Sequence, residues 1–230
     1  MNDKITLYCR EAGEGEPLIM LHGNGESGEY FVHQIAFFKE NYRVLALDTR
    51  GHGQSPRGEG AFNLARFVED LKDFMDEKGI EKANILGFSD GGNTALMFAL
   101  KYPERVKKLI VNGANLNPDG AQPAILDEVR IAYWKAALAA KEGNDPEAKK
   151  QAEMLGLMVE EPHIDPVRLK ELKMETLVIA GVEDVILEEH TKEIAACIPG
   201  AKLAILPGDH FVAAGNPNVF NQTVAEFLRA

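Results

Sequence analysis

The sequence has few cysteines, and their placement excludes several classes of protein. Its 230 residues include two cysteines, Cys9 and Cys197, which lie far apart and form no C-x-x-C pair. A disulfide-stapled secreted domain and a cysteine-based zinc site need more cysteines at closer spacing. One disulfide between the two remains open, but the composition favours two reduced thiols.

Long apolar runs and an excess of basic residues are also missing. No stretch of about 18 apolar residues occurs, so we expect no membrane-spanning helix and no membrane partner. The first residues, MNDKITLYCR, contain neither an apolar run nor a small-residue cleavage site. We therefore expect no signal peptide and a cytoplasmic location. The formal net charge of −11 repels phosphate backbones, so we expect no nucleic-acid partner.

Motifs for metals and nucleotides are missing too. The sequence contains no H-E-x-x-H motif and no paired His/Asp cluster with ligand spacing. It has no Walker pattern, and Gly23 and Gly25 lack the later glycine of a dinucleotide fingerprint. We expect neither a metal nor a cofactor.

What the sequence does contain is an alternation of short apolar runs and longer amphipathic segments. With 45% hydrophobic residues, the chain is long enough to bury one substantial core. Predicted strands cover residues 5–9, 18–21, 44–47, 83–86, 106–111, 176–180 and 202–206. Predicted helices cover residues 30–40, 63–78, 92–101, 188–198 and 218–229. This order predicts an α/β fold with a mostly parallel sheet flanked by helices on both faces.

The alternation stops between two of the later strands. Residues 125–141, 146–158 and 165–172 have helical patterns, and no strand pattern separates them. We expect a core domain of residues 1–115 and 174–230, with a small inserted helical cap of residues 116–173. A long crossover connection without a lid function is the alternative.

A serine lies in a glycine-rich turn where a strand gives way to a helix. Gly87-Phe88-Ser89-Asp90-Gly91 fits the pattern G-x-S-x-G, which exposes a nucleophilic serine on a strained turn. The flanking glycines leave room where a Cβ would collide with neighbouring backbone. The alternative is an ordinary strand–helix turn in which the serine caps the helix.

A serine nucleophile needs a base and a carboxylate, and both follow later strands. Asp184 comes after the strand at 176–180, and His210 comes after the strand at 202–206. Parallel strands would bring both to the sheet edge that carries Ser89, with His210 as general base and Asp184 as its partner. Glu183 could replace Asp184 as the acid, or Asp184 could cap the next helix. We interpret Asp209 as an exposed loop residue.

Stabilising donors for an oxyanion are predicted at two backbone positions. His22-Gly23-Asn24-Gly25 follows a strand, and its pattern H-G-x-G commonly supplies one oxyanion amide. We expect the amides of Asn24 and Asp90 to form this hole, although a plain tight turn is the alternative at 22–25. His22 is expected to brace the turn by hydrogen bonds, and residues 48–55 to form a structural loop.

These motifs resemble those of the α/β-hydrolase superfamily over nearly the whole chain. They are H-G-N-G at 22–25, D-T-R-G-H-G-Q-S at 48–55, G-F-S-D-G-G at 87–92, Asp184 and His210. The run from Gly87 through K-Y-P-E-R-V-K-K-L-I-V-N-G-A-N resembles valacyclovir-hydrolase-like esterases. The resemblance implies hydrolysis of a carboxylic ester or related acyl bond, a helical cap and no cofactor. Val185-Ile186-Leu187 departs from it, because relatives often carry a proline after the acid.

Substrate preference is predicted from Asp90 and from the cap. The Asp90 carboxylate lies beside the nucleophile and could attract the ammonium group of an amino-acid ester, unless it only forms local hydrogen bonds. Trp134 is a candidate substrate contact, and other cap side chains could line an acyl pocket: Tyr133, Leu138, Met154, Leu157 and Met158.

We therefore expect a serine hydrolase acting on a small-molecule ester, either a monomer or a homodimer. The same triad could instead serve a thioesterase, an aminopeptidase or a hydrolase of carbon–carbon bonds. A non-catalytic ligand-binding sensor on this fold is a further alternative. A haloalkane dehalogenase is disfavoured, because that chemistry uses a carboxylate at position 89.

Overall fold

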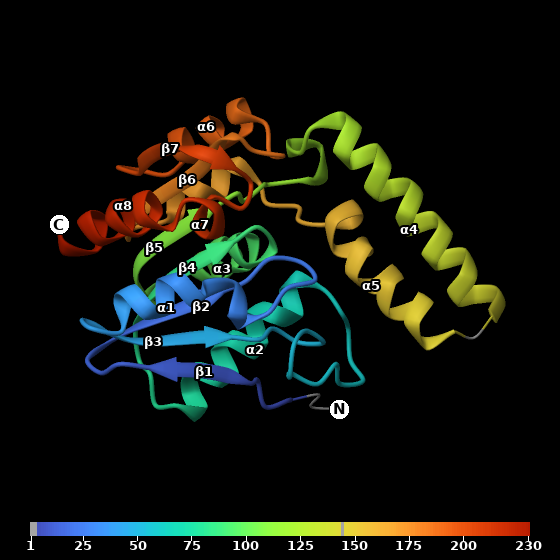
Figure 1. Cartoon of the computed structure of the whole chain (residues 1–230), viewed down its shortest axis with the longest axis horizontal. Helices are drawn as coiled ribbons and strands as arrows, with labels where there is room; N and C mark the ends of the chain where they lie inside the picture. Colours follow the sequence, from blue (N-terminus) through green and yellow to red (C-terminus); the bar gives the residue numbers. More distant parts are fainter. Residues whose placement is uncertain (1–3, 144) are drawn as a thin grey trace.

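The protein is built on one seven-stranded sheet, described here from a computed structural model that covers residues 4–143 and 145–230 (Figure 1). The strands are β1 (Cys9–Ala12), β2 (Glu16–Leu21), β3 (Tyr42–Leu47), β4 (Ala83–Phe88), β5 (Val106–Asn112), β6 (Glu175–Glu183) and β7 (Lys202–Asp209). Their order across the sheet is β1-β3-β2-β4-β5-β6-β7. Only β1 runs antiparallel to its neighbour, so the predicted mostly parallel α/β fold is confirmed.

The first predicted strand, residues 5–9, is wrong in its position, because the observed strand β1 begins at Cys9. Cys9 pairs with Leu47, the last residue of β3, so no strand residue remains for the preceding segment to pair with. Tyr8 bonds instead to the loop beyond β3. Its N–H donates to Ser55 Oγ at 2.8 Å, and its carbonyl accepts from the N–H of Asp48 at 2.9 Å.

Helices cover both faces of the sheet. They are α1 (Val32–Phe38), α2 (Leu64–Glu77), α3 (Asp90–Lys101), α4 (Pro123–Gly143), α5 (Pro146–Glu160), α6 (Glu188–Cys197), α7 (Val212–Gly215) and α8 (Pro217–Arg229). Side chains of α2, α3 and α6 pack on one face, and those of α1, α7 and α8 pack on the other. Successive strand residues point to opposite faces, so both faces are apolar and the strands read as nearly continuous Val, Ile and Leu.

Several predicted boundaries differ from the observed ones. The first predicted helix, 30–40, is a 3-10 turn at Gly28–Phe31 followed by the shorter α1. The predicted third helix of the cap, 165–172, is a 3-10 helix at Pro166–Glu171. Strands β6 and β7 run to Glu183 and Asp209, beyond their predicted ends, because these two residues pair with each other after a register shift. Backbone pairing between strands thus extends past the apolar runs from which the ends were predicted.

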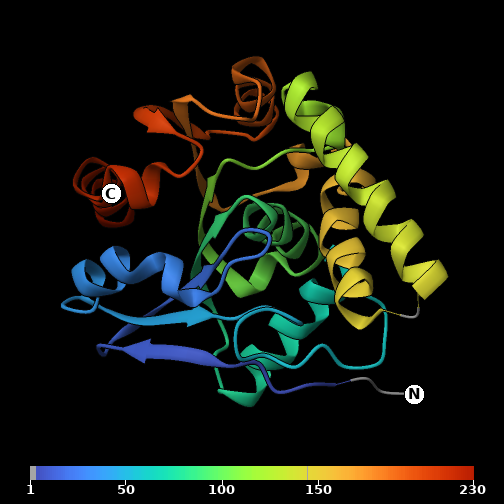
Figure 2. The same cartoon turned by 45° about the vertical axis from the view of Figure 1, so that its right-hand side comes forward.

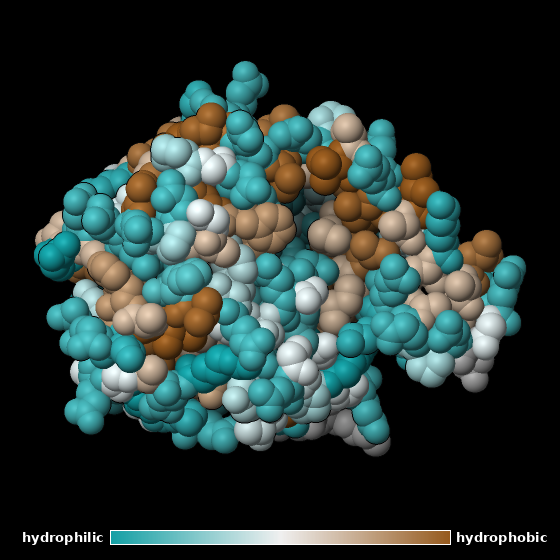
Figure 3. Space-filling model, viewed as in Figure 1, coloured by the Kyte–Doolittle hydropathy of each residue, from teal (hydrophilic) through white to brown (hydrophobic). Residues whose placement is uncertain are grey.

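Helices α4 and α5 form a hairpin that projects beyond the carboxyl ends of the parallel strands (Figures 1 and 2). Arg57, from the loop after β3, forms a two-pronged ion pair with Glu153 of α5 at 2.9 and 2.7 Å. Glu161, just after α5, accepts the N–H of Leu64 at 2.8 Å. Figure 3 shows a hollow between the sheet domain and this hairpin, with apolar side chains gathered on the hairpin side.

The structure can be compared with the sequence for membrane-spanning helices and for a disulfide. Within residues 4–143 and 145–230, every helix is too short or too polar to cross a lipid bilayer. Cys9 and Cys197 are both free thiols.

Candidate active site

Ser89 occupies a strained turn between β4 and α3. Its φ is +53°, and it is the only non-glycine residue with a positive φ in the described part of the chain. A Cβ on Gly87 would lie 2.2 Å from the carbonyl oxygen of Gly91, and a Cβ on Gly91 would lie 2.1 Å from that of Leu21. The two glycines are therefore required by the close approach of backbone on either side of the serine.

The predicted alternative role of Ser89 as a helix cap is not observed. Its side chain makes no capping hydrogen bond to α3, which begins at Asp90 rather than at the predicted Gly92. The half-buried hydroxyl instead points to His210, with 3.1 Å between Ser89 Oγ and His210 Nε2.

Three side chains from separate strand ends meet at this edge of the sheet. His210 follows β7 and Asp184 follows β6, and the distance from His210 Nδ1 to Asp184 Oδ1 is 2.6 Å. Because the carboxylate can only accept, His210 donates from Nδ1, and Nε2 is left to accept the hydroxyl proton of Ser89. His210 and Asp184 are 8% and 5% exposed, so this chain of hydrogen bonds is shielded from water.

Backbone amides hold the Asp184 carboxylate in place. The N–H of Ile186 donates to Oδ1 at 2.9 Å, and the N–H of Gly181 donates to Oδ2 at 3.1 Å. Burial alone raises the pKa of Asp184, but the hydrogen bonds from His210 and these amides outweigh it, so the pKa is lowered. The carboxylate thus stays charged at neutral pH.

The other carboxylates near this loop lie elsewhere. Glu183 is exposed at the end of β6, and Asp209 is the exposed last residue of β7, rather than the loop residue expected, with a carboxylate that accepts the N–H of Phe211. Asp184 does not cap the next helix, because α6 begins at Glu188 with Leu187 in the capping position. Asp184 is therefore the acid that the fold brings to His210.

The departure from the proline pattern after Asp184 has a structural reason. The N–H of Ile186 bonds to Asp184, and the N–H of Leu187 donates to the carbonyl of Gly120 at 2.9 Å. Proline at either position could not make its bond. Segment 185–187 also pairs with residues leading into α4, since the N–H of Gln122 donates to the carbonyl of Val185 at 2.8 Å. This pairing joins the acid loop to the entry of the hairpin.

The two residues predicted to supply the oxyanion amides line one cavity together with Ser89. Asn24 lies in the loop after β2 and Asp90 is the first residue of α3. In the described part of the chain, neither backbone N–H donates a hydrogen bond to another protein group. Free amides at the start of a helix suit a developing negative charge.

His22 braces this loop, as predicted. The N–H of Thr49 donates to His22 Nε2 at 3.0 Å, so the ring proton is on Nδ1, which donates to the carbonyl of Gly23 at 2.7 Å. Burial lowers the pKa of His22 to about 4, which keeps the ring neutral. The loop of residues 48–55 thus has the structural role expected of it.

A cavity of about 220 Å³ opens onto Ser89. It is lined by Gly23, Asn24, Glu26, Phe88, Ser89, Asp90, Asn115, Pro118, Ala121, Ile125, Leu126, Val129, Met158, Glu161, Val185, Ile186, His210 and Phe211. Three of these are carboxylic acids, and none is a lysine or arginine. The cavity therefore combines apolar walls with acidic groups and suits a partly apolar, cationic ligand.

Burial shifts all three carboxyl groups in the same direction. It raises the pKa of Asp90 to about 6, in spite of the hydrogen bond from Asn24 Nδ2 to Asp90 Oδ2 at 2.8 Å. It raises the pKa of Glu26 to about 7, and it also raises that of Glu161. A cation in the cavity would favour the charged form of each group.

Trp134, the cap residue predicted to contact substrate, lies outside this cavity. It is 68% exposed. Trp134 follows Ile125 by nine residues, or two and a half helical turns. The two side chains therefore point to opposite faces of α4, and Ile125 is the one that lines the cavity. Of the other cap side chains proposed, only Met158 lines it.

Several residues that line the cavity at Ser89 were not predicted from the sequence. Ile125, Leu126 and Val129 form the apolar wall from α4, and Glu26 and Glu161 add acidic groups. The helical spacing of Leu126 and Val129 marks a shared face, but nothing in the sequence indicates that this face turns toward Ser89.

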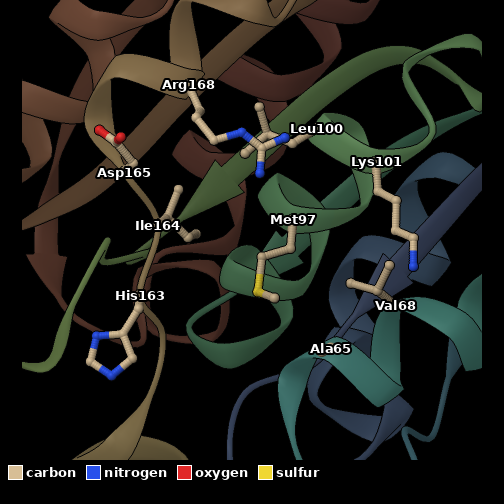
Figure 4. Close-up of a pocket in the computed structure, with 9 residues that line it drawn as sticks. All are labelled: Ala65, Val68, Met97, Leu100, Lys101, His163, Ile164, Asp165 and Arg168. Atoms are coloured by element: carbon tan, nitrogen blue, oxygen red, sulfur yellow. The ribbon is translucent and has the colours of Figure 1, made fainter.

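A second cavity, of about 290 Å³, lies between α2, α3 and the segment after α5 (Figure 4). Its floor is aliphatic, and Lys101 and Arg168 stand at its rim. Both cations are near carboxylates, Lys101 with Glu69 at 2.6 Å and Arg168 with Glu171 at 3.6 Å.

The parallel sheet, the strained serine turn and the acid–histidine pair at one sheet edge define a hydrolase of the α/β type. A family model described as the alpha/beta hydrolase fold matches residues 16–139, more than half of the chain. The chain therefore belongs to the alpha/beta hydrolase fold family, and the predicted resemblance is confirmed.

Individual relatives match nearly the whole chain. The chain is 29% identical to a 2-hydroxy-6-oxononadienedioate/2-hydroxy-6-oxononatrienedioate hydrolase of Comamonas testosteroni, over 97% of this chain and 91% of the relative. It is 29% identical to serine hydrolase BPHL of Mus musculus, over 98% and 84% respectively. A crystal structure of a hydrolase from Pseudomonas aeruginosa PA01 superposes with a TM-score of 0.79 at 27% identity, covering 100% of this chain and 97% of that one.

Proposed function

We propose that the protein is a serine hydrolase that cleaves carboxylic esters of small molecules through an acyl-enzyme intermediate. The observation that carries the proposal is the hydrogen-bonded chain from Ser89 Oγ through His210 to Asp184, with distances of 3.1 and 2.6 Å, at the floor of a cavity. A base within hydrogen-bond reach of a strained serine is the requirement for an activated hydroxyl nucleophile.

Acylation follows from this geometry. His210 Nε2 takes the hydroxyl proton while Ser89 Oγ forms a bond to the ester carbonyl carbon. The carbonyl oxygen becomes negative and accepts from the N–H groups of Asn24 and Asp90. Asp184 stabilises the imidazolium. The tetrahedral intermediate collapses when His210 returns the proton to the alcohol oxygen and the bond from the carbonyl carbon to that oxygen breaks.

Deacylation reverses these roles. Water loses a proton to His210 Nε2 as its oxygen attacks the acyl carbon, and the same two amides stabilise the second oxyanion. His210 then protonates Ser89 Oγ, the bond from Oγ to the acyl carbon breaks, and the acid leaves. Neither half-reaction requires a metal or an organic cofactor.

The acidic groups favour substrates with an ammonium group near the scissile bond. Asp90 follows the nucleophile directly, and its carboxylate lines the cavity together with Glu161. An α-amino group on the acyl side would lie close to these two carboxylates. We therefore include a preference for amino-acid esters in the proposal.

The same charges disfavour the main alternative. The Comamonas relative is by its name a hydrolase of a dienedioate, and a dioate carries two carboxylates. A cavity lined by three acids and by no lysine or arginine would repel such a dianion. Ester hydrolysis is therefore the better match to this site.

We also propose that residues 116–173 act as a cap on a core of residues 1–115 and 174–230. Helix α4 supplies one apolar wall of the cavity, and Asn24 Nδ2 donates to the carbonyl of Met154 in α5 at 2.8 Å. A cap in this position would exclude water from the acyl pocket and limit the size of the substrate.

A labelling experiment tests the nucleophile. A fluorophosphonate should modify the wild type at Ser89, located by mass spectrometry of the peptide. The Ser89→Ala variant should not be labelled, and its turnover of p-nitrophenyl butyrate should be lower than that of the wild type by about 10³-fold or more. Ser27→Ala, at a serine outside the cavity, is the matched control. Labelling without turnover of any ester would favour a ligand-binding sensor, and no labelling would contradict the proposal.

A pair of substrates tests the amino-acid preference. Leucine methyl ester and its des-amino analogue differ only in the α-ammonium group. We expect the wild type to favour the amino ester, and Asp90→Asn to reduce the ratio of the two kcat/KM values by about tenfold. Equal rates on both esters in the wild type would contradict the preference and leave the hydrolase proposal standing.

A further inference from the structure

Glu26 is a cavity residue that the catalytic steps above do not use. Its carboxylate Oε2 accepts the N–H of Gly23 at 3.3 Å, and its own N–H donates to the carbonyl of Gly23 at 3.3 Å. The side chain is half-buried and forms no ion pair with a lysine or arginine in the described ranges 4–143 and 145–230. It is thus a carboxylate inside the proposed substrate cavity that no lysine or arginine neutralises in the described residues, and His210 is the nearby titratable base.

Two phenyl rings lie at the same end of the cavity. A Cβ built on Gly23 would lie 3.0 Å from Phe88 Cε1 and 3.2 Å from Glu26 Oε2, so the ring edge and the carboxylate are close to each other. The centroid of Phe88 is 5.7 Å from that of Phe211, which is 47% exposed at the cavity mouth. Tyr30 stacks on one face of Phe88 at 4.4 Å, and Phe88 is 1% exposed, so Phe211 is the accessible ring of the two.

This end of the cavity is the one that carries the general acid. The Phe88 and His210 ring centroids are 4.9 Å apart, and those of His210 and Phe211 are 5.5 Å apart. His210 must reach the alcohol oxygen of the ester to protonate it, so the leaving group has to extend toward these rings. Asp90 bonds instead to Asn24, whose side chain reaches Met154 of α5, so the acyl-side carboxylate faces the cap.

We propose that Glu26 and the exposed ring of Phe211, which packs against the buried Phe88, form a leaving-group subsite for an organic cation, so that the preferred esters carry a protonated or quaternary amine in their alcohol part. The inference rests on the proposed ester hydrolysis and adds a second cationic position to it. A carboxylate beside aromatic rings is the combination that binds ammonium groups in proteins. No lysine or arginine lines the cavity to compete for the carboxylate.

The ionisation of Glu26 is compatible with this role. Burial raises the pKa of Glu26 to about 7, and the N–H of Gly23 and the nearby His210 offset only part of this effect. A bound ammonium group would offset more of it. A purely structural role, holding the loop of Gly23, would need only a hydrogen-bond acceptor and not a charge.

Two acetate esters separate these roles, because their acyl groups are identical. Acetylcholine carries a quaternary ammonium in the alcohol part, and dimethylbutyl acetate has the same shape with carbon in place of nitrogen. At about pH 8, where Glu26 is ionised, we expect the wild type to favour acetylcholine in kcat/KM by about tenfold. Glu26→Gln keeps an acceptor for Gly23 but removes the charge, and it should bring the ratio close to one.

The control variant is Glu29→Gln, three residues further on, where an exposed carboxylate pairs with Arg10 outside the cavity. It should leave the ratio of the two esters unchanged. If Glu26→Gln lowers both rates by the same factor, Glu26 only supports the loop and the subsite is refuted. A wild-type ratio near one refutes it as well.

Calorimetric titration with choline chloride separates this proposal from the proposed function. Choline should bind the wild type and bind Glu26→Gln about tenfold more weakly, whether or not an ester is hydrolysed. Choline binding without ester turnover would retain the subsite and overturn the esterase proposal. Turnover of p-nitrophenyl butyrate with equal choline affinity in the two proteins would retain the esterase proposal and overturn the subsite.

Discussion

Asn24 Nδ2 donates to Asp90 Oδ2 at 2.8 Å and so joins the two residues whose backbone amides are the proposed oxyanion donors. The same Asn24 amide group donates to the carbonyl of Met154 in α5 at 2.8 Å. One side chain thus connects the loop after β2, the start of α3 and the hairpin. It also stabilises the charged form of Asp90, which is 7% exposed.

Removing the charge of Asp90 should stabilise the fold at alkaline pH. Burial raises the pKa of Asp90 to about 6 in the folded protein, above the ordinary value of 3.8 for an aspartate. The ionised carboxyl therefore costs folding free energy above that pH, and protonation regains it as the pH falls from about 6 to about 4. Asp90→Asn keeps an acceptor for Asn24, and it should raise the free energy of unfolding at about pH 8 by about 2 kcal/mol.

Urea unfolding at several pH values measures this difference. The difference in the free energy of unfolding between Asp90→Asn and the wild type should shrink as the pH falls and disappear at about pH 4. Glu29→Gln, at an exposed carboxylate, serves as a control with little effect at any pH. An Asp90→Asn variant less stable than the wild type at alkaline pH would contradict the prediction.

Exchanging the acid for its amide should disable His210. In Asp184→Asn the amide can donate to Nδ1, so His210 carries its proton on Nε2 and cannot take the proton of Ser89. We expect kcat on p-nitrophenyl butyrate to fall by about 10³–10⁴-fold with the fold retained in circular dichroism. Glu183→Gln, at the exposed neighbour, should stay within about twofold of the wild type. Comparable losses in both variants would show that Asp184 has no special role.

Closing the space beside the serine turn should destabilise the fold. In Gly91→Ala the new Cβ would lie 2.1 Å from the carbonyl oxygen of Leu21 and 2.6 Å from that of His22, so backbone has to move. We expect a loss of about 3 kcal/mol or more in the free energy of unfolding, measured in urea. Gly215→Ala, where no atom lies within 4 Å of the new Cβ, is the matched control. Equal stability of the two variants would remove the steric explanation for this glycine.

Much of this architecture could be predicted because strand and helix leave different periodic patterns. The buried strands read as apolar runs, and the helix Leu64–Glu77 shows an apolar stripe at helical spacing. A post-strand position then predicts which side chains share a sheet edge, and so Ser89, Asp184 and His210 could be expected together. The segment before β1 could not be placed in this way, because its partners are the hydroxyl of Ser55 and the backbone N–H of Asp48 in a loop rather than a strand.

The sequence by itself determined the order of strands and helices, the strained turn at Ser89 and the choice of three side chains for one edge, because these depend on local patterns and chain direction. Only the tertiary structure decided which face of α4 meets the cavity, with Leu126 and Val129 toward Ser89 and Trp134 toward solvent. It also decided that Glu26, Asp90 and Glu161 share one space without a lysine or arginine. Both outcomes depend on how separate elements are oriented relative to one another, and a pattern within a single element carries no information about that orientation.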